Sequence, residues 1–155
     1  MEKQDINRTL TSLRNLCSKR EYCISDIREK AVKALDGDVN AASDVLSALI
    51  RDGYLDNRRY ATAFARDKSS LGGWGRVKIR FNLQSKGISG ADIDYAIAQI
   101  DEDKAEEKLD RLIRTKIKAL EGDPEWKIKM IRFVLGRGYE YDDVSSALER
   151  IQNAE

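Results

Sequence analysis

The sequence contains no histidine among its 155 residues. This absence excludes serine–histidine and cysteine–histidine catalysis, acid–base chemistry by imidazole, and most zinc and iron sites. Its two cysteines, Cys17 and Cys23, have five residues between them, which is not the spacing of a Cys-x-x-Cys redox or zinc motif. We expect both thiols to pack between helices. We also expect no catalytic site, no bound metal and no cofactor, so that the protein is not an enzyme.

Proline occurs once, at Pro124, and aromatic residues make up only 7% of the chain. Charged residues reach 35% and apolar residues 41%, a composition that is too apolar for a disordered chain and typical of a mostly helical one. No apolar run approaches the roughly 18 residues of a membrane span. The first residues lack the apolar core of a signal peptide. We therefore expect a cytoplasmic protein without membrane contact.

Neither sign of charge is in excess, because 28 basic residues face 27 acidic ones. Overall basicity therefore cannot bring the protein to nucleic acid. Any such contact must come from charges that the fold segregates in space.

A helical repeat of about 50 residues organises the chain. The segment Lys86-Gly87-Ile88 recurs as Arg137-Gly138-Tyr139, and in both copies apolar residues follow the glycine at +6, +10 and +13. This is the spacing of one helix face. A looser copy follows Gly37. We expect each of these glycines at a helix end, because glycine enters the left-handed conformation cheaply.

The repeat predicts an all-α fold of three tandem three-helix repeats, which we assign to residues 1–53, 54–101 and 102–155. Such units can share cores in an extended array or in a globule, and periodicity favours neither. In helix 74–86, Trp74, Val77 and Phe81 are expected to form the apolar side. The nine predicted helices span residues 5–19, 24–36, 40–52, 57–69, 74–86, 90–100, 103–119, 124–136 and 141–152.

The glycine-rich segment 72–76, GGWGR, has some likeness to a phosphate-binding loop. It lacks the following Gly-Lys-Ser/Thr and a preceding strand, so we interpret it as a flexible joint between helices.

Basic residues form the clearest candidate binding surface. Residues 66–90 hold six basic residues and only one acidic residue, Asp67. Farther along the chain, Glu107 and Arg111 have the i, i+4 spacing of a helical ion pair. These basic residues form either an ordinary solvated helix surface or a cationic face for nucleic acid or for an acidic protein that holds it. Charge alone does not decide between the two. The candidate residues are Trp74, Arg76, Lys78, Arg80, Lys86, Arg111, Arg114, Lys118, Lys127, Lys129 and Arg132.

Three segments together carry a family resemblance. They are the junction DGYLDNRRYATAF at residues 52–64, the turn Lys86-Gly87-Ile88, and the turn Arg137-Gly138-Tyr139. Their order resembles that of the RecX family of bacterial regulators of the RecA recombinase, over roughly residues 10–151. The family has aspartate where this chain has Asn57, and phenylalanine where it has Tyr60 and Tyr139.

The resemblance implies an elongated, curved array of three repeats that binds the RecA–DNA filament along its groove. It implies restraint of the recombinase, ATPase and coprotease activities of RecA, and thereby regulation of DNA repair, recombination and the SOS response. The implied partners are the RecA filament and single- or double-stranded DNA, bound weakly and in a salt-dependent way by a monomer. We expect the junction residues Asp56, Tyr60 and Phe64 to be structural.

Two other function classes deserve comparison. A three-helix unit is similar to a helix-turn-helix, which would make the protein a transcriptional regulator. Against this, no helix concentrates the Asn, Gln and Arg residues that read bases, and there is no obvious dimer element. A nuclease is disfavoured by the lack of histidine and of a paired-carboxylate motif.

Overall fold

A computed structural model describes residues 2–154, which contain nine helices and no strand. The prediction of an all-α array is confirmed, and all nine predicted helices are present with bounds within two residues of those expected. Within the described residues no helix is long and apolar enough to cross a membrane. The helices are α1 (Lys3–Lys19), α2 (Ile24–Ala34), α3 (Val39–Arg51), α4 (Asn57–Ser70), α5 (Arg76–Ser85), α6 (Gly90–Ala98), α7 (Glu102–Ala119), α8 (Trp126–Gly136) and α9 (Tyr141–Asn153).

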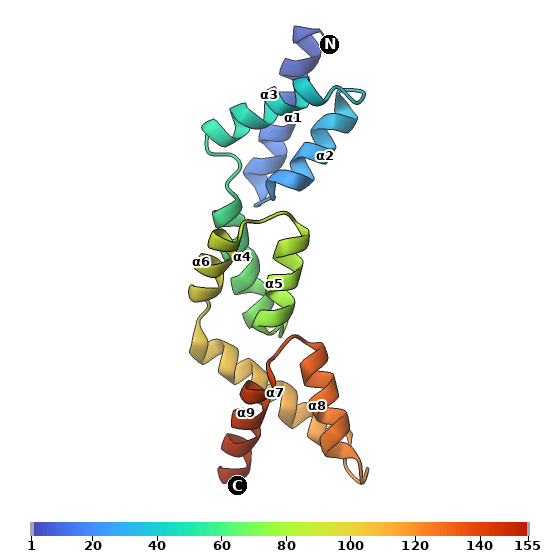
Figure 1. Ribbon diagram of the computed structural model, residues 1–155, viewed down its shortest axis with the longest axis vertical. Coiled ribbons are helices and arrows are strands. Elements are labelled where there is room, and N and C mark those ends of the chain that lie inside the picture. Colours follow the sequence, from blue (N-terminus) through green and yellow to red (C-terminus); the bar gives the residue numbers. More distant parts are fainter. Residues whose placement is uncertain (1, 155) are drawn as a thin grey trace.

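The helices follow one another in groups of three along a single long axis, with the two termini at opposite ends (Figure 1). The accessible surface is 9644 Å². A compact monomer of the same mass would expose about 7,900 Å². The excess surface means that the three groups meet only end to end, as in a solenoid.

Each group of three helices has its own apolar core. The largest fully buried side chains include Ile27 and Leu49 in the first group, Ile79 in the second, and Ile113 and Met130 in the third. Because each apolar helix face is buried against its own group, each group is close to a small domain in its packing.

Neighbouring groups nevertheless share residues. Cys23, which precedes α2, is buried in the second core, and Ala105 of α7 packs against the same core. Both cysteines are buried free thiols, as expected. The three groups are called units below; their division after residues 53 and 101 stays a prediction.

The expected apolar side of α5 is wrong in part. Ile79 and Leu83 face the core, whereas Val77 and Phe81 are 52% and 70% exposed. Trp74 packs against the second core but precedes the helix. Both pairs of side chains have the i, i+4 spacing of a helix face, so periodicity could not choose between them.

The junction residues are structural, as predicted. Asp56 caps α4, and its side chain accepts a hydrogen bond of 3.1 Å from the backbone N–H of Arg59. Tyr60 and Phe64 pack against the second core with their ring centroids 5.9 Å apart. This junction therefore fixes how the first unit leads into the second.

The joint between the first and second units uses the turn that ends α5. The hydroxyl of Ser25 donates to the carbonyl of Lys86 at 2.8 Å, and the Lys86 ammonium lies 3.0 Å from a carboxylate oxygen of Asp26. The hydrogen bond to Asp26 raises the pKa of Lys86. The backbone N–H of Ile24 donates to the side chain of Asn57 at 2.9 Å. The turn of one unit is thus docked on the first turn of α2 in the unit before it.

The joint between the second and third units repeats this arrangement at the equivalent positions. The backbone N–H groups of Gly75 and Val77 donate to the carbonyls of Arg137 and Gly138, at 2.8 and 3.0 Å. A Cβ atom added at Gly75 would lie 2.3 Å from the Gly138 oxygen. The glycine-rich segment is therefore a close backbone contact, and its interpretation as a flexible joint is wrong.

Candidate binding surface

Four of the predicted binding residues form ion pairs within the chain. Arg80 pairs with Asp94 at 2.9 Å and Lys129 with Asp123 at 2.6 Å, while Arg76 pairs with Glu102 and Lys86 with Asp26. The carboxylate partners neutralise much of the field of these cations. An approaching anion would have to compete with those partners.

The other predicted cations form no ion pair with any carboxylate of residues 2–154. The expected pair between Glu107 and Arg111 does not form. The unpaired predicted cations are Lys78, Arg111, Arg114, Lys118, Lys127 and Arg132.

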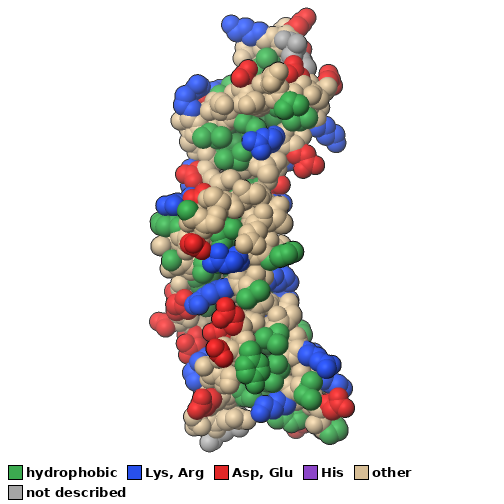
Figure 2. Space-filling view, viewed as in Figure 1, with side chains coloured by type: hydrophobic (Ala, Val, Ile, Leu, Met, Phe, Trp, Pro, Cys, Tyr) green, Lys and Arg blue, Asp and Glu red, His purple; other side chains and the backbone are tan. Residues whose placement is uncertain are grey.

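These unpaired cations do not share one surface. Arg114 and Lys118 border a hollow of about 590 Å³ at the far end of the third unit, beside Glu121. Lys127 and Arg132 are exposed on α8. On the face drawn in Figure 2, basic and acidic side chains alternate over most of the length, and basic ones gather over the edge formed by α8.

A first aromatic platform lies around Trp74. The ammonium groups of Lys68 and Lys78 lie 4.7 and 4.3 Å from the centroid of its ring. Phe64 contacts the same indole edge-on, at a centroid distance of 5.9 Å. Such cation–π contacts hold two positive charges beside a half-buried indole, which also lines a hollow that contains Glu102 and Glu106.

A second aromatic platform lies in a groove between α7 and α8. The volume of this groove is about 370 Å³. The Lys116 ammonium lies 4.5 Å from the centroid of the Phe133 ring, and the Phe133 side chain is 38% exposed. Of the residues that the structure describes, no carboxylate lines this groove. Its lining residues are Lys108, Arg111, Leu112, Thr115, Lys116, Ala119 and Phe133.

The two platforms are linked through Gly73. A Cβ atom added there would lie 3.2 Å from Cε of Lys108 and 3.6 Å from a guanidinium nitrogen of Arg137, so both side chains converge on this glycine. Arg137 donates to the carbonyls of Gly72 and Gly73, which are neutral and leave its charge uncompensated.

We name the resulting surface the basic–aromatic strip. It consists of Lys68, Trp74, Lys78, Lys108, Arg111, Lys116, Phe133 and Arg137.

Three of the strip residues, Trp74, Lys78 and Arg111, are among the predicted candidate residues. Lys68, Lys116 and Arg137 belong to the basic runs of the sequence but not to that candidate set. The spacing of Lys108, Leu112 and Lys116 places them on one face of α7, and this signal could have found the groove. The meeting of α7 with the loop before α5 has no such signal, because it joins residues of different units.

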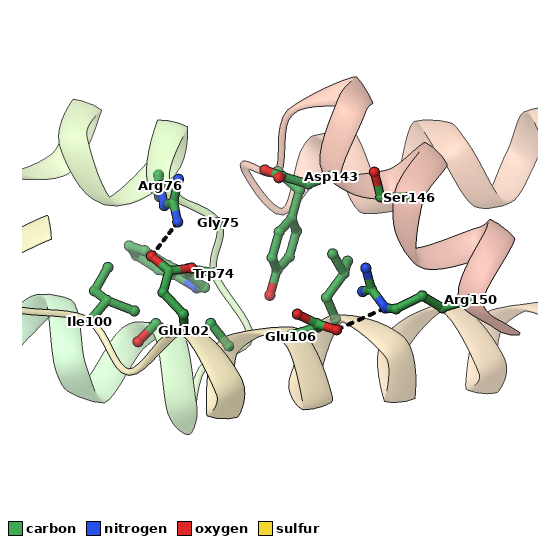
Figure 3. A pocket seen from close by; sticks show the side chains of 13 residues that line it. Trp74, Gly75, Arg76, Ile100, Glu102, Glu106, Asp143, Ser146 and Arg150 are labelled. Atoms are coloured by element: carbon green, nitrogen blue, oxygen red, sulfur yellow. Dashed lines mark hydrogen bonds and ion pairs between the residues drawn. The ribbon is translucent and has the colours of Figure 1, made fainter. Parts of the chain in front are cut away.

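A second hollow at the same joint has a different character. It measures about 110 Å³ and contains two ion pairs, Arg76 with Glu102 and Arg150 with Glu106 (Figure 3). The hydroxyl of Tyr139 is buried there without a hydrogen-bond partner, and burial raises the pKa of Tyr139 to about 12. Carboxylates balance the arginines, so this hollow offers no net attraction for an anion.

Comparison with known proteins supports the resemblance found in the sequence. A family model described as the second three-helix domain of RecX matches residues 56–97. Regulatory protein RecX of Clostridium botulinum (strain Eklund 17B / Type B) is 30% identical over 149 residues, covering 83% of this chain and 69% of that protein. Regulatory protein RecX of Salmonella paratyphi A (strain ATCC 9150 / SARB42) is 28% identical over 134 residues, covering 81% and 80%.

Solved structures share the fold. The crystal structure of RecX from Lactobacillus salivarius superposes with a TM-score of 0.84 at 19% identity, covering 97% of this chain and 99% of that one. A second crystal structure of regulatory protein RecX gives a TM-score of 0.83 at 21% identity, covering 94% and 73%. The helix order fits the resemblance found in the sequence, and the identity to these relatives shows the family. The chain belongs to the RecX family of regulatory proteins.

Proposed function

We propose that this protein binds the RecA–DNA filament and lowers the recombinase, ATPase and coprotease activities of RecA. The observation that carries the proposal is membership of a family of regulatory proteins, combined with an array that exposes one long surface. A solenoid of this kind can contact several protomers of a filament at once, so that individually weak contacts add up.

The basic–aromatic strip supplies a contact surface for this role. Six of its residues are cations without a carboxylate partner among residues 2–154. A filament is negatively charged wherever its DNA or an acidic protomer surface is accessible. Electrostatic attraction therefore favours docking through the strip, and the attraction should weaken as salt is added.

The test is the ATPase of the cognate RecA on single-stranded DNA. Addition of this protein should lower the rate of ATP hydrolysis, and the protein alone should hydrolyse none. A Lys108→Ala/Lys116→Ala variant should need a higher concentration for the same inhibition. The charge-matched control Arg28→Ala/Lys33→Ala, two exposed residues of α2 outside every ion pair, should act as wild type. Unchanged RecA turnover at both substoichiometric and stoichiometric additions would refute the function.

A further inference from the structure

We propose that the hollow around Tyr139, at the joint between the second and third units, is a binding site for a short aliphatic diamine. Its ammonium groups would meet the carboxylates of the walls, and its carbon chain would lie on the apolar floor. The hollow shares only Trp74 with the basic–aromatic strip. The inference goes beyond the proposed function and does not rest on it.

The hydroxyl of Tyr139 is the first indication of a ligand. Tyr139 lines the hollow and is 8% exposed, and its hydroxyl has no hydrogen-bond partner among residues 2–154. Buried polar groups are almost always hydrogen-bonded, so the partner of this hydroxyl has to be a molecule from outside the chain. Burial raises the pKa of Tyr139 to about 12. At neutral pH the phenol therefore keeps its proton, and its oxygen can accept a hydrogen bond from an ammonium group.

The ionised side chains of the hollow favour a cation. They are three carboxylates and two guanidinium groups, those of Glu102, Glu106, Asp143, Arg76 and Arg150. The Arg150 guanidinium is shared between Glu106, at 2.9 Å, and Asp110, at 2.8 Å, which does not line the hollow. Asp143 forms no ion pair with residues 2–154. One negative charge of the lining is thus left over, and a bound cation would compensate it.

The size and the floor of the hollow favour a short carbon chain. Its volume is about 110 Å³, whereas one water needs roughly 10–15 Å³ of such space. It therefore has room for a small organic molecule. Ile100, Ala105 and Leu109 line it as well, and methylene groups placed against these side chains would be removed from water. A metal ion would gain nothing from them, and no cluster of the described residues is arranged to hold one.

Carboxylates on two walls favour a molecule with an ammonium group at each end. Glu102 and Glu106 belong to α7, whereas Asp143 belongs to the first turn of α9. Figure 3 shows Asp143 across the hollow from the two glutamates. A diamine can place one ammonium at each wall with its alkyl chain between them. An amino acid would instead bring its own carboxylate close to one of these walls, where like charges repel.

Isothermal titration calorimetry with 1,4-diaminobutane tests the site on the full chain at neutral pH. We expect saturable binding of one diamine per chain with a millimolar or lower dissociation constant, since so small a ligand reaches only modest affinity. Three compounds of similar length serve as controls: 1,4-butanediol, succinate and 4-aminobutanoate. Each should bind at least about tenfold more weakly, because each lacks one or both charge-assisted hydrogen bonds.

Tryptophan fluorescence shows whether the diamine binds at this hollow, because Trp74 lines it. The chain has only two tryptophans, and Trp126 lines the separate hollow at the end of the third unit. In a Trp126→Phe background, the emission of Trp74 should therefore change with the same dissociation constant as the calorimetry gives.

Two matched pairs of variants then identify the groups that hold the amine. Tyr139→Phe removes only the hydroxyl and should weaken binding at least about tenfold, as expected for a hydrogen bond to a charged group. Asp143→Asn should weaken it at least as much. The controls are Tyr141→Phe and Asp142→Asn, which make the same changes at exposed residues of α9 outside the hollow. Both controls should bind the diamine as wild type does, and circular dichroism confirms the folding of each variant.

Several results would overturn the proposal. Absence of saturable binding at tens of millimolar diamine would mean that water alone occupies the hollow. Equal affinity for the diol would assign binding to the apolar floor, and tighter binding of 4-aminobutanoate would make the hollow a site for zwitterions. Wild-type affinity in Tyr139→Phe or Asp143→Asn, or an equal loss in Asp142→Asn, would show that the named groups do not hold the ligand. None of these measurements contains RecA, so they leave the ATPase test of the proposed function independent.

Discussion

Replacing Gly75 by alanine tests whether the close backbone contact holds the second and third units together. Gly75 has φ −82°, so alanine fits its own backbone without strain. The added Cβ would instead lie 2.3 Å from the Gly138 oxygen and 2.4 Å from the backbone nitrogen of Tyr139. Both are backbone atoms of the neighbouring unit, which cannot turn aside as a flexible side chain would. The substitution therefore has to push the two units apart.

The expected cost follows from two contributions. Overpacking by one methyl group in a tight contact costs about 1–3 kcal/mol. Separation of the units also lengthens the hydrogen bonds from Gly75 to Arg137 and from Val77 to Gly138, at about 0.5–1.5 kcal/mol each. We therefore expect Gly75→Ala to lower the free energy of unfolding by about 2–6 kcal/mol.

Urea unfolding followed by circular dichroism measures this change. The matched control is Gly136→Ala at the end of α8, where an added Cβ meets nothing within 4 Å and where alanine favours the helix by up to about 1 kcal/mol. The control should be unchanged or slightly stabilised. Stability of Gly75→Ala within about 0.5 kcal/mol of wild type would show that the units are not held by this contact. Two separate transitions in Gly75→Ala would show that the contact also couples the unfolding of the units.

Two further predictions concern Tyr139 and the shape of the molecule. Tyr139→Phe should be neutral or stabilising by up to about 1 kcal/mol, because the buried hydroxyl has no hydrogen-bond partner. The folded protein keeps the phenol proton up to a pKa of about 12, against 10.0 for an unburied tyrosine. Wild type should therefore lose about 1.4 kcal/mol more than Tyr139→Phe per pH unit between pH 10 and about 12 in urea titrations; parallel curves would refute the burial argument. Small-angle scattering should give a radius of gyration above the ~15 Å of a compact chain of this length, and the compact value would exclude the array.

The helices and their repetition could be predicted from the sequence because they depend on local signals. Gly37, Gly87 and Gly138 all have positive φ at helix ends, as the repeat predicted. The apolar positions after Gly87 and Gly138 supply buried side chains, for example Ile93 and Val144. Both signals lie within one unit and have a fixed spacing.

The contacts between units could not be predicted in the same way. Nothing in the spacing of Val77 and Phe81 shows that Ile79 and Leu83 take the core side of α5. Likewise the glycines of segment 72–76 carry no sign, within their own unit, of the backbone that packs against Gly75. The basic–aromatic strip also depends on contacts between units. Counting charges along the chain therefore could not separate cations that form ion pairs, such as Arg80, from cations that form none.

The two joints explain why the strip lies at the second one. Asp26 and Lys78 occupy equivalent positions in the two joints. Asp26 is the third residue of α2, and Lys78 is the third residue of α5. The turn that docks there contributes a cation in both cases, Lys86 at the first joint and Arg137 at the second. At the first joint Asp26 neutralises Lys86. At the second, the equivalent position carries another positive charge, and Arg137 bonds only to neutral carbonyls. One reversal of charge at equivalent positions of the two joints thus leaves Lys78 and Arg137 at the second joint without a carboxylate partner among residues 2–154.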